Sequence, residues 1–159
     1  MKFSATSLSR LQTVHPDLQT VANYVIQFVD FSVIWGKRTT EQQFTLFQKG
    51  RMYLDGKWII IEKDDVVTYC DGCDKKSKHQ SGEALDIVFY RPTEPHIIWK
   101  GPKAERANYY LMGAFIGAAE MLYKYGAIDS DIISGGNWDD DGDLEDQTFM
   151  DVFHFERKQ

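Results

Sequence analysis

Two histidines and one aspartate, His79, Asp86 and His154, have the residue types that could perform metal-assisted chemistry in this sequence. Two imidazole nitrogens and one carboxylate oxygen make three ligands, the number that a catalytic zinc ion takes when its fourth position stays open for water. Asp151 lies three residues before His154 and adds a carboxylate beside such an ion. These residues therefore suggest hydrolysis assisted by zinc.

The run of apolar residues around Asp86 predicts a buried strand. Residues 84–90 are rich in strand-forming side chains, and strand alternation points Leu85 into a core on the face opposite Asp86. Gly82 permits a tight turn before this strand, which brings His79 back toward Asp86. By residue type alone, Asp86 could equally be a hydrogen-bonded buried carboxylate and His79 an ordinary loop histidine.

The spacing of these residues resembles a known signature. Ser77, His79, Gly82, Ala84 and Asp86 reproduce the pattern S-x-H-x-x-G-x-A-x-D of the zinc D-Ala-D-Ala carboxypeptidase and L-alanyl-D-glutamate endopeptidase family. Within that family the chain most resembles the phage endolysins, which cleave peptidoglycan stem peptides. The resemblance implies an α+β fold of the D-Ala-D-Ala carboxypeptidase or hedgehog-like kind. In that fold a small antiparallel sheet carries the zinc site, and helices pack against the sheet.

Two further motifs resemble the same family. The run Asp-Val-Phe-His at residues 151–154 resembles its Glu- or Asp-x-x-His motif, with Asp and Phe as in the endolysin branch. It implies that Asp151 is the general base and His154 the third zinc ligand. Residues 36–43 resemble the motif Gly-x-Arg-Thr-x-x-x-Gln, whose arginine points into the active site. Arg38 would then hold a substrate carbonyl or carboxylate, although by residue type it could be a surface arginine.

The remaining elements are predicted from hydrophobic periodicity and turn residues. In a regular strand Asp151 and His154 would point to opposite faces, so we expect a bend between them. Segment 50–76 leads into the zinc signature, and we expect it to form one wall of a cleft. Gly113, Ala114, Gly117 and Ala118 suggest close packing of a long helix against another element. In chain order we expect a helix of about four turns from Pro16, a strand at 31–35, a helix from Thr39 or Thr40 to about Lys49, short strands at 57–61 and 66–69, a helix at 104–125 and a strand at 131–134.

An acidic loop is a candidate calcium site. Asn137, Asp139, Asp141 and Asp143 occupy oxygen-ligand positions of a calcium-binding loop around a glycine turn. Thr148 stands where a bidentate Glu would close the loop, so a merely solvated acidic loop is an equal alternative. A calcium ion here could order the loop and tune the neighbouring zinc site.

Length and composition indicate one globular catalytic domain over residues 1–159, with 43% hydrophobic and 14% aromatic residues. Six acids lie between Asp139 and Asp146, and without them acids and bases are equal in number. This balance argues against a nucleic-acid surface, which requires a basic face. Cys70 and Cys73 form a lone C-x-x-C pair, which could be two reduced thiols, a disulfide or a second metal site.

The chain contains no apolar run long enough for membrane insertion and no secretory signal peptide. We therefore expect the protein to be made in the cytoplasm of an infected bacterial host and to reach the cell wall by a separate release route. We also expect it to be a monomer. The resemblance implies that its partner is peptidoglycan and its reaction hydrolysis of the L-Ala-D-Glu bond. The alternatives are a D-Ala-D-Ala carboxypeptidase or dipeptidase, a metal-binding module that recognises the wall without cutting it, and a structural domain.

Overall fold

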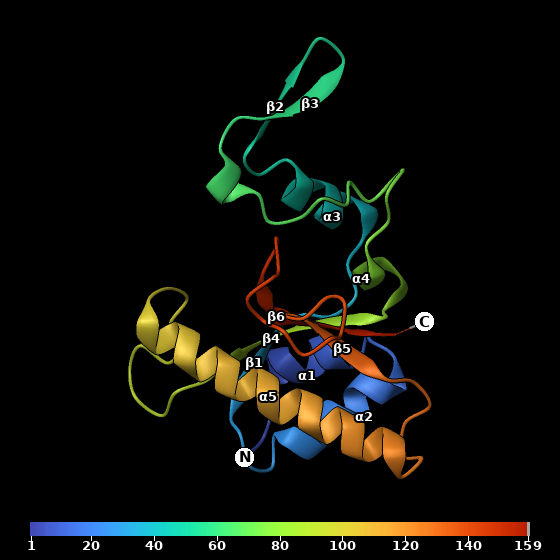
Figure 1. Ribbon diagram of the computed structural model, residues 1–159, viewed down its shortest axis with the longest axis vertical. Helices are drawn as coiled ribbons and strands as arrows, with labels where there is room; N and C mark the ends of the chain where they lie inside the picture. The colour runs from blue at the N-terminus through green and yellow to red at the C-terminus, as the bar shows by residue number, and fades with distance from the viewer. Residues whose placement is uncertain (159) are drawn as a thin grey trace.

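The computed structural model describes residues 1–158 and is built around a four-stranded antiparallel sheet (Figure 1). The sheet order is β1 (Phe31–Trp35), β4 (Ala84–Phe89), β6 (Asp151–Arg157), β5 (Ile132–Gly135), and the helices that pack with it are α1 (Ala5–Leu11), α2 (Pro16–Val25) and α5 (Pro102–Lys124). Two helices, α2 and α5, pack together beneath one face of this sheet, and α1 lies along the edge strand β1, as the α+β prediction requires.

The hydrophobic core lies between the sheet and these helices. Leu85 and Ile87 of β4 point into it, which confirms the predicted alternation of that strand. Phe155 of β6 meets Phe115 of α5 with ring centroids 4.4 Å apart. Because successive strand residues alternate between faces, the neighbours of these core residues point to the opposite face of the sheet. That face carries the candidate site.

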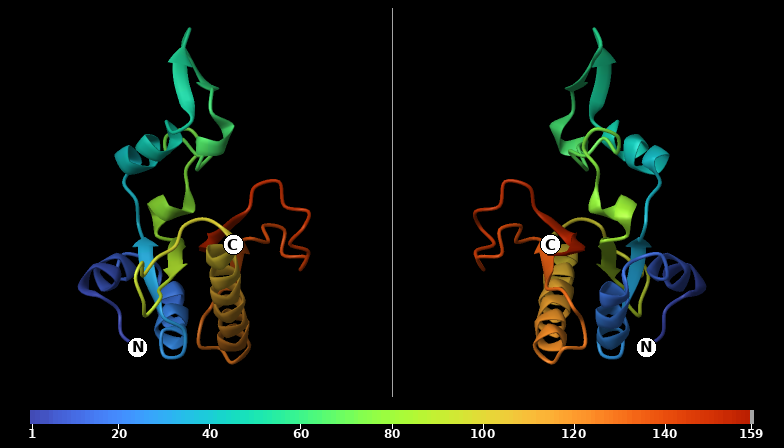
Figure 2. Two further views of the ribbon diagram at one scale, coloured as in Figure 1. Left: turned by 90° about the vertical axis from the view of Figure 1, so that its left-hand side faces the viewer. Right: turned by 90° about the vertical axis from the view of Figure 1, so that its right-hand side faces the viewer.

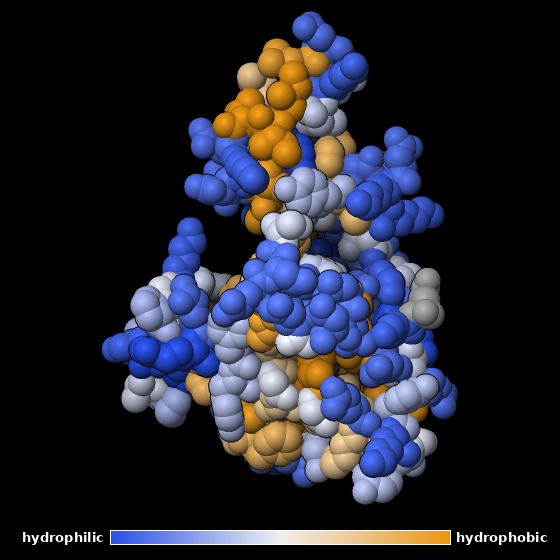
Figure 3. Space-filling view, viewed as in Figure 1, coloured by the Kyte–Doolittle hydropathy of each residue, from blue (hydrophilic) through white to orange (hydrophobic). Residues whose placement is uncertain are grey.

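The segment between β1 and β4 forms a projecting unit on the far side of the sheet from the helices (Figure 2). Its two-stranded hairpin turns at Asp55 and Gly56, both with positive φ, as the tightest hairpin turns require. Figure 3 shows apolar surface over this hairpin, where Leu54 and Ile59 are exposed. The unit consists of α3 (Thr40–Phe47), β2 (Arg51–Leu54), β3 (Lys57–Ile60), the short 3₁₀ helix η1 (Lys63–Asp65) and α4 (Lys78–Ser81).

Several predicted elements are confirmed. The strand at 31–35 and the long helix, observed as Pro102–Lys124, are present, and the strand predicted at 131–134 is β5. Thr39 caps α3 in a reciprocal capping box with Gln42, and this helix ends at Phe47. The first predicted helix is α2, but it ends at Val25, after which the hydrogen bonds become irregular.

Other predictions were wrong or incomplete. Residues 66–69 form no strand, because no neighbouring strand pairs with them: the amide of Val66 donates to the carbonyl oxygen of Lys63, and the guanidinium of Arg51 donates to the carbonyl oxygen of Thr68. Helix α1 and strand β2 are too short to give a clear periodic signal. The close packing expected of the small residues in the long helix holds for Ala114 and Ala118, which lie against the core, but not for Gly113 and Gly117, where a side chain would meet open space.

None of the helices in residues 1–158 combines the length and apolarity needed to cross a bilayer.

The ring of Phe115 provides a direct test of this core. Replacement by Ala in Phe115→Ala should lower the free energy of unfolding by about 3–5 kcal/mol, because a fully buried ring leaves a cavity. Denaturant titration followed by circular dichroism would measure the change. The matched control is Tyr125→Ala, at an aromatic residue just after the same helix that is 78% exposed, and it should change stability by less than about 0.5 kcal/mol. Equal losses in the two variants would contradict the assignment of the core.

Candidate metal centre and active site

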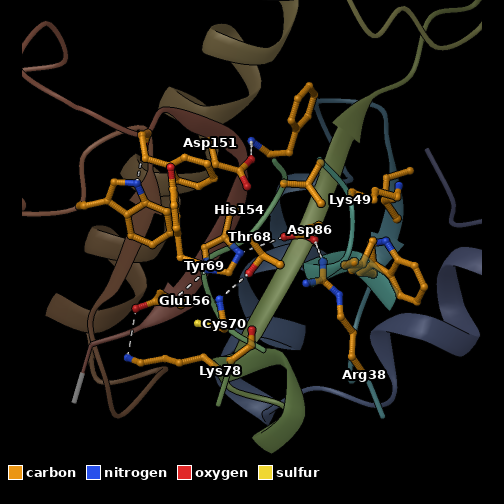
Figure 4. A pocket seen from close by; sticks show the side chains of 18 of the residues that line it. Arg38, Lys49, Thr68, Tyr69, Cys70, Lys78, Asp86, Asp151, His154 and Glu156 are labelled. Carbon is orange, nitrogen blue, oxygen red and sulfur yellow. Dashed lines mark hydrogen bonds and ion pairs between the residues drawn. The ribbon is translucent and has the colours of Figure 1, made fainter. Parts of the chain in front are cut away.

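Three chain segments bring His79, Asp86 and His154 together on the sheet face opposite the helices. Asp86 of β4 and His154 of β6 are directly paired across the two strands, so their side chains point to the same side (Figure 4). His79 comes from α4, which Ser77 caps and which ends at Gly82 in the left-handed conformation. The chain therefore turns back into β4 within a few residues. All three side chains are buried.

The facing atoms of these side chains form a triangle of the size that a metal ion requires. Oδ1 of Asp86 lies 3.0 Å from Nε2 of His79 and 3.0 Å from Nδ1 of His154, and the two nitrogens are 3.2 Å apart. Tetrahedral zinc with bonds of about 2.0–2.1 Å separates its ligand atoms by about 3.3 Å. The donor set and its spacing therefore fit zinc with little movement.

The other nitrogen of each ring is held by an oxygen atom that fixes its tautomer. Nδ1 of His79 donates to the carbonyl oxygen of Gly36 at 2.8 Å. Nε2 of His154 donates to Oε2 of Glu156 at 3.0 Å, and Oε1 of Glu156 is paired with Nζ of Lys78 at 3.2 Å. In the neutral rings, the two nitrogens that face Asp86 then carry the lone pairs that a metal ion needs.

Arg38 is the cation that faces the outer oxygen of Asp86. Its Nη2 is paired with Oδ2 of Asp86, which leaves Oδ1 turned toward the two histidines. Nη1 donates to Oε1 of Gln43 at 3.3 Å, and Nε is buried without a partner among residues 1–158. The geometry thus gives Arg38 a role in orienting Asp86.

The charges of this cluster shift one another's protonation. Burial alone would raise the pKa of Asp86, but the two histidines beside it hold that pKa far below its usual range. Burial lowers the pKa of His79 and favours its neutral ring. Burial also opposes the charged form of His154, but hydrogen bonds to Asp86 and Glu156 outweigh it and raise the pKa of His154 to about 9. Without a metal ion, the Asp86 carboxylate therefore attracts a proton to His154.

Asp151 reaches the same cleft because β6 is irregular. Opposite β5, Phe155 pairs with Ser134 but Asp151 pairs with the very next residue, Gly135, so residues 152–154 bulge. This is the expected bend, although Asp151 itself begins the strand and does not lie in a turn. Burial and the nearby Asp86 carboxylate raise the pKa of Asp151, which favours proton exchange closer to neutral pH.

The cluster opens into a cleft of about 490 Å³. Asp86, Asp151 and His154 all line it, and residues 67–70 form one wall, which confirms the expected role of segment 50–76. The ring of Trp138 lies against His154, with centroids 5.2 Å apart. The other aromatic lining residues are Trp35, Tyr69, Trp99, Phe149 and Phe153.

Comparison with known proteins identifies the family. The sequence profile described as phage L-alanyl-D-glutamate peptidase matches residues 1–157. The chain belongs to the phage L-alanyl-D-glutamate peptidase family. It is therefore a cell-wall hydrolase of the endolysin type. Comparison with curated proteins found no match.

A solved structure supports the fold. The crystal structure of the L-Ala D-Glu endopeptidase ChiX of Serratia marcescens superposes with a TM-score of 0.65. The two sequences are 22% identical, and the match covers 99% of this chain and 90% of ChiX. At this identity the similarity establishes the architecture, and the family assignment rests on the sequence profile.

The acidic loop of this phage L-alanyl-D-glutamate peptidase gathers a different set of carboxylates from the predicted one. Asp139, Asp141 and Asp146 approach one another, and Asp143 does not belong to this group. Oδ1 of Asn137 is buried and has no partner among residues 1–158. All three clustered acids are exposed, and exposed acids often gather without an ion. The calcium site stays a prediction.

Cys70 and Cys73 are free thiols. Among residues 1–158, neither belongs to a group of side chains that could hold a metal ion. Cys70 lines the cleft, where burial raises the pKa of its thiol. The structure therefore agrees with the first of the three alternatives, two reduced thiols.

The family motifs did not indicate Glu156, the acid that holds His154. A signal was nevertheless present, because Glu156 follows His154 by two residues and a strand places such residues on one face. A carboxylate that holds the far nitrogen of a metal-bound imidazole typically changes metal affinity by roughly 10-fold to 100-fold.

Removal of this carboxylate tests the arrangement. Glu156→Ala should weaken zinc binding by roughly 10-fold to 100-fold, because His154 loses the acceptor that orients it. Glu156→Gln keeps an acceptor oxygen and should lose less. Competition with a chromophoric chelator would measure the affinities, with Glu62→Ala as a control at an exposed acid of the projecting unit. Unchanged affinity in Glu156→Ala would show that His154 is held by other contacts.

Proposed function

We propose that this phage L-alanyl-D-glutamate peptidase is a zinc endopeptidase that hydrolyses the L-Ala-D-Glu amide bond of peptidoglycan stem peptides. The proposal is supported above all by the triangle of Nε2 of His79, Oδ1 of Asp86 and Nδ1 of His154 at the floor of the cleft. These three atoms would hold the ion. Bound zinc supplies an activated water and polarises the scissile carbonyl.

The proposed general base is Asp151. Its carboxylate lines the cleft with Asp86 and His154 and has no cationic partner among residues 1–158, so it is available for proton transfer. It takes the proton from the attacking water and passes it to the amine of the departing D-glutamyl residue. Burial keeps this carboxylate away from bulk water and allows it to serve in both steps.

Arg38 is proposed as a positioning residue. Its ion pair with Oδ2 of Asp86 stabilises the buried carboxylate and aims Oδ1 at the metal site. Because its Nη atoms already contact Asp86 and Gln43, we favour this role over the direct grip on a substrate carbonyl or carboxylate that the family motif suggested.

The substrate is a cell-wall polymer, so the protein must act at the wall. We propose that it does so as a monomer, made inside the infected bacterium and delivered to peptidoglycan by a separate release route.

Metal removal combined with fragment analysis tests this function. The purified protein should contain about one zinc per chain, and a chelator should abolish digestion of isolated cell walls until zinc is restored. Mass spectrometry of the fragments should show new amino termini at D-Glu. Release of terminal D-Ala alone would identify a carboxypeptidase instead. Zinc binding without any digestion would identify a wall-binding module, and a protein that never binds zinc would refute the metal centre.

A substitution at the base separates catalysis from metal binding. Asp151→Asn should retain zinc but lower kcat by roughly 100-fold or more, because the amide cannot accept the water's proton. His79→Ala should lose zinc and activity together, which makes it the matched comparison. The measurement is metal content alongside steady-state cleavage of a synthetic L-Ala-D-Glu peptide. An Asp151→Asn protein with wild-type turnover would exclude this residue as the base.

A further inference from the structure

Some of the cationic side chains that line the cleft form ion pairs with protein carboxylates, and others do not. Two of its four cations are in ion pairs: Arg38 with Asp86, and Lys78 with Glu156. Nζ of Lys78 also donates to the backbone carbonyl oxygen of Arg157. These two cations stabilise the anions that surround the metal centre. They are therefore not free to bind a substrate anion without exposing a buried carboxylate.

The other two cations of the cleft, Lys49 and Lys76, have no protein partner for their charge among residues 1–158. Both side chains are exposed, and neither forms a hydrogen bond or ion pair with any of residues 1–158. Lys49 lies in the turn after α3, and Lys76 directly precedes Ser77, the cap of α4. In Figure 4 Lys49 is drawn on the opposite side of Asp86 from the Lys78–Glu156 pair. The cleft therefore presents ammonium groups that no protein carboxylate neutralises.

The proposed substrate brings a charge that needs such a partner. A D-glutamyl residue has two carboxyl groups, and the continuing peptide uses at most one of them. A free carboxylate therefore lies a few bonds from the scissile nitrogen unless it is amidated. In the cleft it would lie near Asp151, the lining carboxylate that has no cationic partner among residues 1–158, since Asp86 and Glu156 are already paired. Like charges at this range repel, so a productive complex requires a cation close to the substrate.

We propose that Lys49 and Lys76 form a subsite for the free carboxylate of the D-glutamyl residue. This subsite rests on the proposed endopeptidase function and makes the enzyme select substrates whose carboxyl group is free over substrates in which it is an amide. Charge-assisted hydrogen bonds of this type change affinity by roughly 10-fold to 100-fold. Because the contact lies beside the reacting bond and not at it, the selection acts mainly through KM.

Two synthetic peptides that differ in one group test the subsite. Both contain the L-Ala-D-Glu bond, and the D-glutamyl residue carries either a free carboxylate or a carboxamide. The wild-type protein should cleave the carboxylate peptide with a kcat/KM roughly tenfold or more above that of the amide peptide. Lys49→Met and Lys76→Met keep the apolar length of the side chain and remove the charge. They should raise KM for the carboxylate peptide only, and the double variant should abolish the preference.

The control variant is Lys57→Met, at an exposed lysine of the hairpin turn that does not line the cleft. It should behave as the wild type, and all variants should keep wild-type zinc content and melting temperature. Equal cleavage of the two peptides by the wild-type protein, or a preference for the amide, would overturn the subsite while leaving the endopeptidase intact. So would lysine variants that lose activity equally on both peptides. A wild-type protein that holds zinc and cleaves neither peptide would refute the proposed function, and the subsite with it.

Discussion

The Asp86 carboxylate is the group on which the rest of the site depends. It is a buried anion in the middle strand pair of the sheet, and an unpaired charge there would cost several kcal/mol. The structure surrounds it with side chains from three separate segments: the guanidinium of Arg38 pairs with one oxygen, and ring nitrogens of His79 and His154 face the other. The Asp86 carboxylate therefore connects the loop after β1, helix α4 and strand β6 to β4. The same convergence creates the triangle of ligand atoms.

One face of the sheet packs against the hydrophobic core, and the other face carries the candidate site. The lower face is covered by α2 and α5, and its packed aromatic and aliphatic side chains hold β4 and β6 in register. That register decides which side chains lie opposite one another on the upper face. The upper face is covered by the projecting unit, by the loop before β6 and by Trp99 of the segment before α5, and a cleft remains over the ligands. A rigid core thus positions the site, while more exposed segments shape what enters it.

Two oxygen atoms outside the ligand set hold the histidine rings in position. The carbonyl oxygen of Gly36 and the carboxylate of Glu156 each hold the far nitrogen of one ring, so the near nitrogens are prepared for a cation before one arrives. Such preparation removes part of the reorganisation that metal binding would otherwise require. It also explains the difference between the cleft's lysines, since Lys78 supports Glu156 whereas Lys49 and Lys76 remain available to a ligand.

The sequence by itself determined the ligand types, their spacing and most local elements. The alternation around Asp86, the capping residues Ser77 and Thr39 and the left-handed Gly82 depend on near neighbours, so their signals are readable in the chain. Only the tertiary structure decided that residues 66–69 are not a strand, that a bulge brings Asp151 and His154 into one cleft, and which cations are already paired. Those outcomes depend on which distant segments meet, because a buried polar group takes whichever partner packing places beside it.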